Sequence, residues 1–155
     1  MGIKEIYNFV QLTDHIATSG QPLESEFVLI AQSNHKAVIN IAMHNSDDAI
    51  SNEGHIVTAL GMSYFHIPVP FDAPTIEHLK LFIKVMECLK GKKVWAHCAA
   101  NYRVSAFMYQ YLKLLCGLSS KEAKSSIFDL WYPNEAWKGI MELSKEKIAH
   151  KNSSL

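Results

Sequence analysis

The stretch of sequence that decides the fold runs Val94-Trp95-Ala96-His97-Cys98-Ala99-Ala100-Asn101-Tyr102-Arg103-Val104-Ser105. Its first residues are typical of a buried strand, and apolar residues return at helical spacing in the part of the chain that follows. These apolar residues are Phe107, Met108, Tyr111, Leu112 and Leu115. The stretch therefore predicts a strand, a tight loop and a helix, with Cys98 at the helix entrance.

The predicted loop has the chemistry of an oxyanion site. Unpaired N–H groups and the positive end of the helix dipole attract anions at a helix N-terminus, and they also favour the nucleophilic thiolate form of Cys98. Arg103 adds a guanidinium group whose planar fork matches two oxygens of a phosphate or sulfate. Asn101 suits a position with positive φ, because asparagine tolerates the left-handed region. The loop thus predicts a reactive cysteine beside a bound oxyanion.

His97-Cys98 followed by Arg103 and Ser105 resembles the phosphate-binding signature of cysteine-dependent protein tyrosine and dual-specificity phosphatases. The sequence is more similar still to the small bacterial phosphatase-like family that is also found fused to β-lactamase-like hydrolases. The resemblance covers most of the chain. It includes Ser19-Gly20-Gln21-Pro22, Val38-Ile39-Asn40-Ile41, Ile67-Pro68-Val69 and Trp131-Tyr132-Pro133-Asn134-Glu135-Ala136-Trp137.

The resemblance implies a role for each residue of the site. Cys98 is the nucleophile, Arg103 holds the phosphate oxygens, and Asp72, on a proline-bounded loop, is the general acid. His97 orders the loop and tunes the thiol, and the Ser105 hydroxyl assists the leaving thiolate. The residues expected to bind substrate are His97, Ala99, Ala100, Asn101, Tyr102, Val104 and Ser105. No metal or cofactor is implied.

The spacing of the loop departs from the broad phosphatase pattern. Four residues separate Cys98 from Arg103, whereas that pattern has five and usually a glycine where Asn101 stands. The shorter spacing resembles rhodanese-type sulfurtransferases, whose smaller loop suits a sulfur atom. Three functions therefore stay open: a phosphatase that acts on a protein or small-molecule phosphate monoester, a sulfurtransferase that forms a persulfide on Cys98, and a catalytically weak phosphate-binding module.

Composition limits the remaining possibilities. The length of 155 residues and 48% hydrophobic content suit one phosphatase-like domain over residues 1–155. Fifteen basic and fifteen acidic residues give no net charge, which argues against a nucleic-acid partner. The sequence shows no signal-peptide pattern and no stretch of roughly 20 apolar residues that would cross a membrane. Cys88, Cys98 and Cys116 are widely spaced and odd in number, so we expect a reducing, cytoplasmic setting.

Strand and helix signals alternate along the chain. The expected strands are 16–18, 36–42, 64–69 and 94–97, with a short helix or strand within 3–12. The expected helices are 25–32, 52–60, one from Thr75 that ends before Gly91, one after the central loop, one from Ser119 to Pro133, and 135–150. This alternation predicts an α/β fold with a central, mainly parallel sheet covered by helices on both faces, and the resemblance implies a phosphotyrosine-phosphatase-like fold. Such sheets bind ligands at the carboxyl ends of their strands, where Cys98 lies.

Other polar residues are weaker candidates for a role in the chemistry. Asp47 and Asp48 follow another strand and are alternatives to Asp72 as the general acid. The eight histidines have no compact spacing of metal ligands, so we expect no metal. Tyr102 fits either the mouth of the pocket or the packing beneath the loop, and Trp131 and Trp137 are expected to anchor the core.

Overall fold

The computed structural model describes residues 2–152. The strands are β1 (Val10–Gln11), β2 (Ile16–Ser19), β3 (Ala37–Asn40), β4 (Ser63–His66) and β5 (Val94–His97). The helices are η1 (Ile3–Glu5), α1 (Glu24–Gln32), α2 (Glu53–Ala59), α3 (Ile76–Cys88), α4 (Tyr102–Leu115), α5 (Ser120–Ala123), η2 (Ser126–Asp129), α6 (Glu135–Met141) and α7 (Lys145–Asn152), where η1 and η2 are 3-10 helices.

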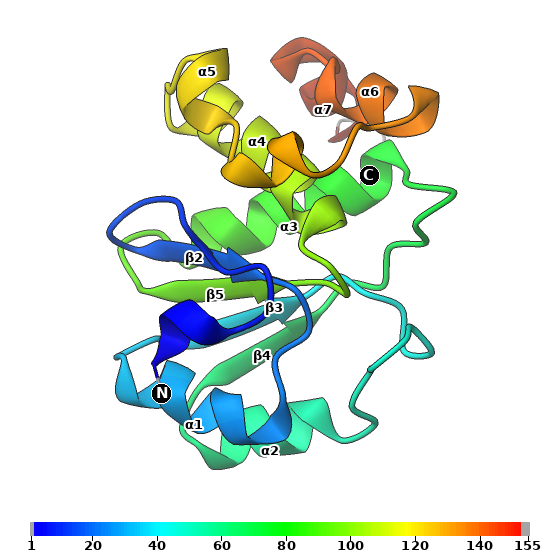
Figure 1. The fold of residues 1–155 in the computed structure, drawn as a ribbon. Helices are drawn as coiled ribbons and strands as arrows, with labels where there is room; N and C mark the ends of the chain where they lie inside the picture. Colours follow the sequence, from blue (N-terminus) through cyan, green and yellow to red (C-terminus); the bar gives the residue numbers. More distant parts are fainter. Residues whose placement is uncertain (1, 153–155) are drawn as a thin grey trace.

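The five strands form one sheet in the order β1-β2-β5-β3-β4 (Figure 1). Only β1 runs antiparallel to its neighbour, and the other four strands are parallel. β5 lies in the centre, where His97 is in register with Ser19 of β2 and with Asn40 of β3. Cys98 therefore leaves the middle of the sheet at the carboxyl edge, between the ends of two other strands.

Helices cover both faces of the sheet, with α1 and α2 on one side and α3, α4, α6 and α7 on the other (Figure 1). Every residue of β2, β3 and β5 is buried, as expected for strands covered on both faces. Successive side chains alternate between two apolar clusters: Trp95 packs with Phe27 on the α1 side, and Ala96 with Phe107 on the α4 side. The α/β fold expected from the sequence is confirmed.

The helix expected from Ser119 to Pro133 is wrong after its first turn. The capping box at Ser119 is present, since its hydroxyl accepts from Glu122 N and the Glu122 carboxylate accepts from Ser119 N. Helix α5 nevertheless ends at Ala123, and Lys124 is extended. The Ser125 hydroxyl accepts from Ile127 N and begins η2, so a local side-chain hydrogen bond ends the longer helix.

The last expected helix is two helices, α6 and α7, instead of one. The side-chain amide of Gln110 donates to the carbonyls of Ile140 and Leu143, which a continuous helix would have used within itself. The Ser144 hydroxyl then accepts from Lys147 N and begins α7. In α1, Phe27 and Ile30 form the buried apolar face, and Val28 is 40% exposed.

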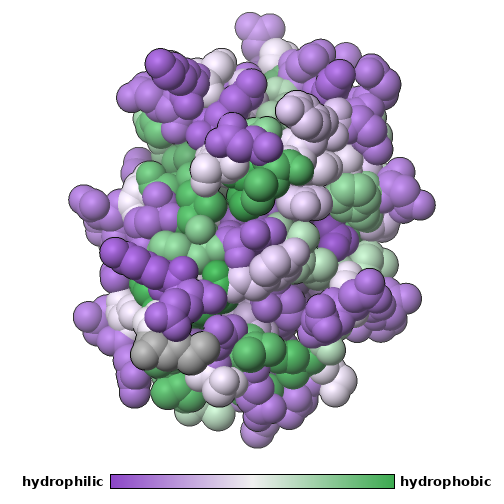
Figure 2. Space-filling view, viewed as in Figure 1, coloured by the Kyte–Doolittle hydropathy of each residue, from purple (hydrophilic) through white to green (hydrophobic). Residues whose placement is uncertain are grey.

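Hydrophilic side chains cover most of the face seen in Figure 2, and apolar side chains appear between them in separate patches. Within residues 2–152, no helix is both long enough and apolar enough to cross a bilayer.

Candidate active site

The loop between β5 and α4 has the backbone that its sequence predicts. Asn101 is left-handed, with φ 70°, and α4 begins at the next residue. The Asn101 side chain is fully buried and holds this turn from within. Its amide donates to the carbonyl of Asn8 at 2.8 Å and to the hydroxyl of Thr18 at 3.0 Å. The expectation of a positive φ at Asn101 is confirmed.

Several backbone donors of the loop have no acceptor. Among residues 2–152, no carbonyl or side chain accepts from the N–H groups that follow Cys98 around the turn and into the first turn of α4. These are the N–H groups of Ala99, Ala100, Tyr102, Arg103 and Val104. Unpaired N–H groups at a helix N-terminus bind anions well, because they are dipoles already oriented toward one point. This loop is therefore suited to a tetrahedral oxyanion.

Arg103 lies in the first turn of α4 and is 94% buried, since its residual exposure is 6%. Its Nη1 donates to the carbonyl of Val69 at 2.8 Å, and its guanidinium carbon lies 5.7 Å from the centre of the Phe71 ring. No other guanidinium N–H donates to a residue that the structure describes. The remaining fork of donors is thus available to a ligand of the loop.

The end of β2 and the segment that follows it support the loop. The indole N–H of Trp95 donates to the Ser19 hydroxyl, and Gln21 N donates to the carbonyl of Ala99 at 3.0 Å. Between them, Gly20 forms a bridge with Ala100. A Cβ at Gly20 would lie 2.7 Å from the carbonyl oxygen of Ala99 and 2.4 Å from the Tyr7 ring. The close contact of these two segments therefore requires glycine.

A buried ion pair lies beneath Cys98. The Nε2 of His97 lies 2.6 Å from a carboxylate oxygen of Glu53, and its Nδ1 lies 3.1 Å from the carbonyl oxygen of Cys98. Both ring nitrogens thus face acceptors, a geometry that a protonated imidazole satisfies. Gln21 donates to the second carboxylate oxygen of Glu53 at 2.8 Å.

Burial alone would raise the pKa of Glu53, but the charge of His97 and hydrogen bonds from His97, Gln21 and Tyr64 hold it below its usual value. Burial and the Glu53 carboxylate raise the pKa of Tyr64 far above its usual range, so this hydroxyl stays a neutral donor. Sequence reasoning missed Glu53. The only local signal is its place at the start of a helix, five residues after Asp48.

The Ser105 hydroxyl contacts the side chains of Asn101 and Ser125. It donates to the Asn101 side-chain oxygen at 3.0 Å and lies 3.2 Å from the Ser125 hydroxyl. His97, Asn101, Val104 and Ser105 are all buried. The roles expected for these residues stay predictions.

The loop that bears Asp72 lies against Arg103. Val69 accepts from Arg103, Phe71 lies under its guanidinium, and the Phe71 carbonyl accepts from the indole of Trp137 at 2.7 Å. Asp72 itself is exposed. Asp47 and Asp48 are exposed on the loop after β3, and Asp48 has φ 64°. The structure thus brings the Asp72 loop directly to the arginine of the site.

A group of aromatic rings packs beside the loop. Tyr102 stacks on Trp131 with ring centres 5.2 Å apart and planes 1° from parallel. Trp131 also contacts Phe71 and Trp137. Trp131 is 9% exposed and Trp137 is fully buried, consistent with both as core anchors. Tyr102 is half-buried, and its place at the mouth of the pocket stays a prediction.

Cys98 is fully buried, and Cys88 and Cys116 are exposed thiols. In the part of the chain that the structure describes, no three His, Cys, Asp or Glu side chains are grouped as metal ligands.

No protein-family model matches the chain, and a search of curated proteins gives no match. Solved structures do match. The "Putative phosphatase (DUF442)" of Shewanella putrefaciens CN-32 is 32% identical to this chain, with a TM-score of 0.83. That match covers 96% of this chain and 95% of the other.

Two further structures share the fold at lower identity. Tk-PTP in its active form is 22% identical with a TM-score of 0.72, and the match covers 92% of this chain and 97% of that one. PTPMT1 in complex with PI(5)P is 15% identical with a TM-score of 0.74, and the match covers 94% and 97%.

Proposed function

The chain belongs to the DUF442 family, within the superfamily of cysteine-dependent tyrosine and dual-specificity phosphatases, and from that premise we propose that it hydrolyses phosphate monoesters through a phosphoenzyme on Cys98. One observation carries the proposal. Cys98 and Arg103 share a loop whose N–H groups, within residues 2–152, mostly lack an acceptor. A phosphoryl group supplies the acceptors that these donors need.

In the first step the Cys98 thiolate attacks phosphorus and the bond from phosphorus to the ester oxygen breaks. The loop amides and Arg103 hold the three equatorial oxygens, whose charge is spread in the transition state. Asp72 gives its proton to the departing oxygen. The products of this step are a free alcohol or phenol and a thiophosphate on Cys98.

In the second step the Asp72 carboxylate takes a proton from water, and the water oxygen attacks phosphorus. The sulfur–phosphorus bond breaks, inorganic phosphate leaves and the Cys98 thiolate is restored. Glu53 and His97 act as positioning residues in both steps, because they fix the backbone of Cys98 from beneath.

The second candidate function is sulfur transfer through a Cys98 persulfide. The four-residue spacing between Cys98 and Arg103 favours it, because a shorter loop encloses a smaller group. The unpaired donors favour the phosphatase, because the terminal sulfur of a persulfide is a weak acceptor that makes little use of them.

One parallel assay distinguishes the two functions. Phosphate release from aryl phosphates and thiocyanate formation from thiosulfate and cyanide are measured on the same preparation, with Cys98→Ser as the inactive control and Cys88→Ser as the matched control for an exposed thiol. We expect phosphate release that is lost in Cys98→Ser and retained in Cys88→Ser. Sulfur transfer alone would overturn the proposal.

A further inference from the structure

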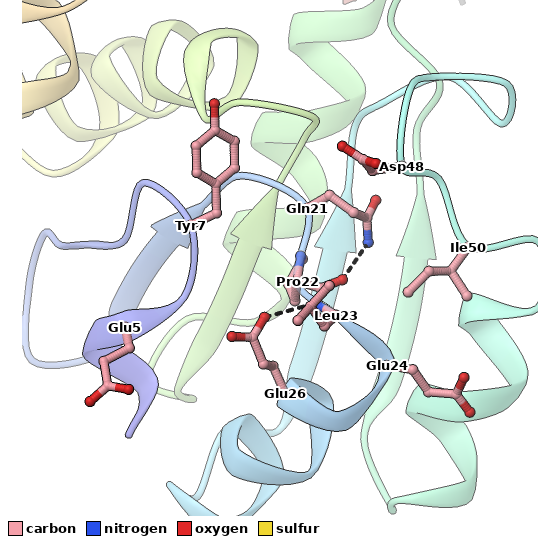
Figure 3. Close-up of a pocket in the computed structure, with 9 residues that line it drawn as sticks. All are labelled: Glu5, Tyr7, Gln21, Pro22, Leu23, Glu24, Glu26, Asp48 and Ile50. Atoms are coloured by element: carbon pink, nitrogen blue, oxygen red, sulfur yellow. Dashed lines mark hydrogen bonds between the residues drawn. The ribbon is translucent and has the colours of Figure 1, made fainter. Parts of the chain in front are cut away.

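The Glu53 carboxylate is hydrogen-bonded from three sides, and only 2% of the residue is exposed. Gln21 donates to one carboxylate oxygen at 2.8 Å, and the other oxygen lies 2.6 Å from Nε2 of His97. The same amide nitrogen of Gln21 also donates to the carbonyl of Pro22 (Figure 3), which fixes the orientation of the amide. The third donor is the hydroxyl of Tyr64, on β4, two strands away from β5.

The hydroxyl of Tyr64 has one proton to donate, and its neighbours decide where that proton goes. The side-chain oxygen of Asn40 accepts from Ala42 N at 2.9 Å, so the nitrogen of the same amide donates to the Tyr64 oxygen at 3.0 Å. Within residues 2–152, the one acceptor left for the Tyr64 proton is the Glu53 carboxylate. Tyr64 therefore accepts from Asn40 and donates to Glu53.

The packing of the Tyr64 ring keeps its hydroxyl in this place. The ring lies directly against Gly54, the residue after Glu53, where a Cβ would be only 3.0 Å from a ring carbon. Tyr64 and Glu53 also line the same pocket, which has a volume of about 260 Å³ and lies among α2, β3 and β4. Glycine at position 54 thus lets the ring pack on the first turn of α2.

We infer that Tyr64 is a positioning residue for Cys98, on which it acts through Glu53 and His97 without contacting the substrate. This inference rests on the proposed role of Cys98 as the nucleophile. Tyr64 stabilises the ionised Glu53 carboxylate, and the carboxylate holds a proton on Nε2 of His97. The other ring nitrogen then donates to the Cys98 carbonyl, 3.1 Å away, so a positive charge and a fixed peptide group lie beside the thiolate.

Removal of the Tyr64 hydroxyl should therefore weaken the positive charge of His97. In Tyr64→Phe the ring and its packing remain, but the Glu53 carboxylate loses one of its three donors and becomes a stronger base. The proton between Glu53 and His97 then moves toward the carboxylate, and the charge beside the Cys98 thiolate falls. The loop amides and Arg103 keep their places, so binding of an oxyanion should not change.

The first measurement is of the ¹⁵N NMR signals of the His97 ring at pH 7. We expect two protonated nitrogens in the native protein, and a shift toward the signals of a neutral imidazole in Tyr64→Phe. Tyr111→Phe is the matched control, because it removes the hydroxyl of a buried tyrosine that hydrogen-bonds to Cys116 near the end of α4. Unchanged His97 signals in Tyr64→Phe, or the same shift in Tyr111→Phe, would overturn the inference.

The second measurement separates the chemical step from binding. Tyr64→Phe should lower kcat for an aryl phosphate by about three- to tenfold and leave the inhibition constant of inorganic phosphate within about twofold of the native value. In a Glu53→Gln background, the same substitution should have little further effect, because Tyr64 acts through the carboxylate. Tyr111→Phe should change neither constant.

Three outcomes of the kinetic measurement count against the role of Tyr64. They are an unchanged kcat, a loss of phosphate binding that matches the fall in kcat, and an effect of Tyr64→Phe that persists in full without the Glu53 carboxylate. If the His97 signals shift as expected but the native protein releases no phosphate, the phosphatase proposal fails and the role of Tyr64 stands.

Discussion

The two edges of the sheet each hold a buried histidine, and the two rings differ in their hydrogen-bond partners. At the carboxyl edge, His97 has an acceptor at each ring nitrogen, one of them the Glu53 carboxylate. At the amino edge, the Nδ1 of His35 lies 3.1 Å from the carbonyl oxygen of Ile30. Its Nε2 has no partner among the described residues. The His35 ring instead packs edge-on against Trp95, with centres 5.2 Å apart.

The difference follows from what each histidine supports. Burial lowers the pKa of His35, and nearby Lys93 lowers it further against the hydrogen bond to Ile30, so a neutral ring fills the core there. The carboxyl edge keeps a buried charge and a set of hydrogen bonds around it, directly before Cys98. Buried polarity in this molecule is thus concentrated where chemistry is expected, and the amino edge is packed for stability.

The largest expected effect belongs to the carboxyl edge alone. Asp72→Asn should slow hydrolysis of esters with poor leaving groups by about 10²- to 10⁴-fold, because an alkoxide cannot leave without a proton. Esters of acidic phenols should lose much less. Rates measured across leaving groups check this, with Asp14→Asn at the amino edge as the control. If the loss of rate is equal for all leaving groups and the melting temperature is unchanged, Asp72 is not the general acid. Asp47 or Asp48 would then be the candidate.

Removing the partner of His97 and the ring of His35 tests the comparison in stability. Glu53→Leu should lower the free energy of unfolding by about 3–5 kcal/mol, because it leaves His97 buried without its counter-charge. His35→Leu should change it by less than about 1 kcal/mol. The carbonyl of Ile30 still accepts from Ser33 N and His35 N, which are backbone groups. Urea denaturation at pH 7 measures both, and equal losses would remove the distinction.

The backbone of the loop gives a smaller effect. Asn101→Ala and Asn101→Gly both lose the hydrogen bonds to Asn8 and Thr18, but only alanine is strained at a φ of 70°. The glycine variant should therefore be more stable than the alanine variant by about 1–2 kcal/mol. The same urea titration compares them. If the two variants unfold together, the left-handed turn carries no strain.

The smallest expected effect is in the pH dependence of stability, to which His35 and Glu53 contribute in different pH ranges. The unfolded state binds a proton to His35 more readily than the folded state, so stability falls as pH drops below the ordinary histidine value of 6.5. Glu53 also loses its contribution at low pH, because its pKa is lowered in the folded state. That contribution is present above the ordinary glutamate pKa of 4.5 and is lost as pH falls below it. Urea midpoints from pH 7.5 to 5.0 should decline in the native protein and flatten in His35→Leu.

Features that depend on neighbouring residues were predictable from the sequence. The left-handed Asn101 and the capping box at Ser119 follow from local chemistry, and the structure has both. The residue pattern around Cys98 also placed the loop between a strand and a helix, as the structure has it.

Features that depend on distant contacts were not predictable. Glu53 meets His97 across 44 residues, and that pairing depends on how α2 sits under β5. The Ser125 hydroxyl also lies 3.2 Å from that of Ser105, a contact across 20 residues that the spacing of apolar residues does not reveal. Gln110 likewise divides the last helix from a position 30 residues away.

The residues that hold the loop between β5 and α4 nearly all precede it in the chain. The bonds to Asn8, Thr18, Glu53 and Val69 reach back between 34 and 93 residues, and of the bonds described here only that from Ser105 to Ser125 reaches forward. A ribosome releases these partners before it releases Cys98. The loop therefore leaves the exit tunnel after the segments that will bind it, and a nascent chain that has exposed α4 already contains almost every group needed to close the site, before α6 and α7 are made.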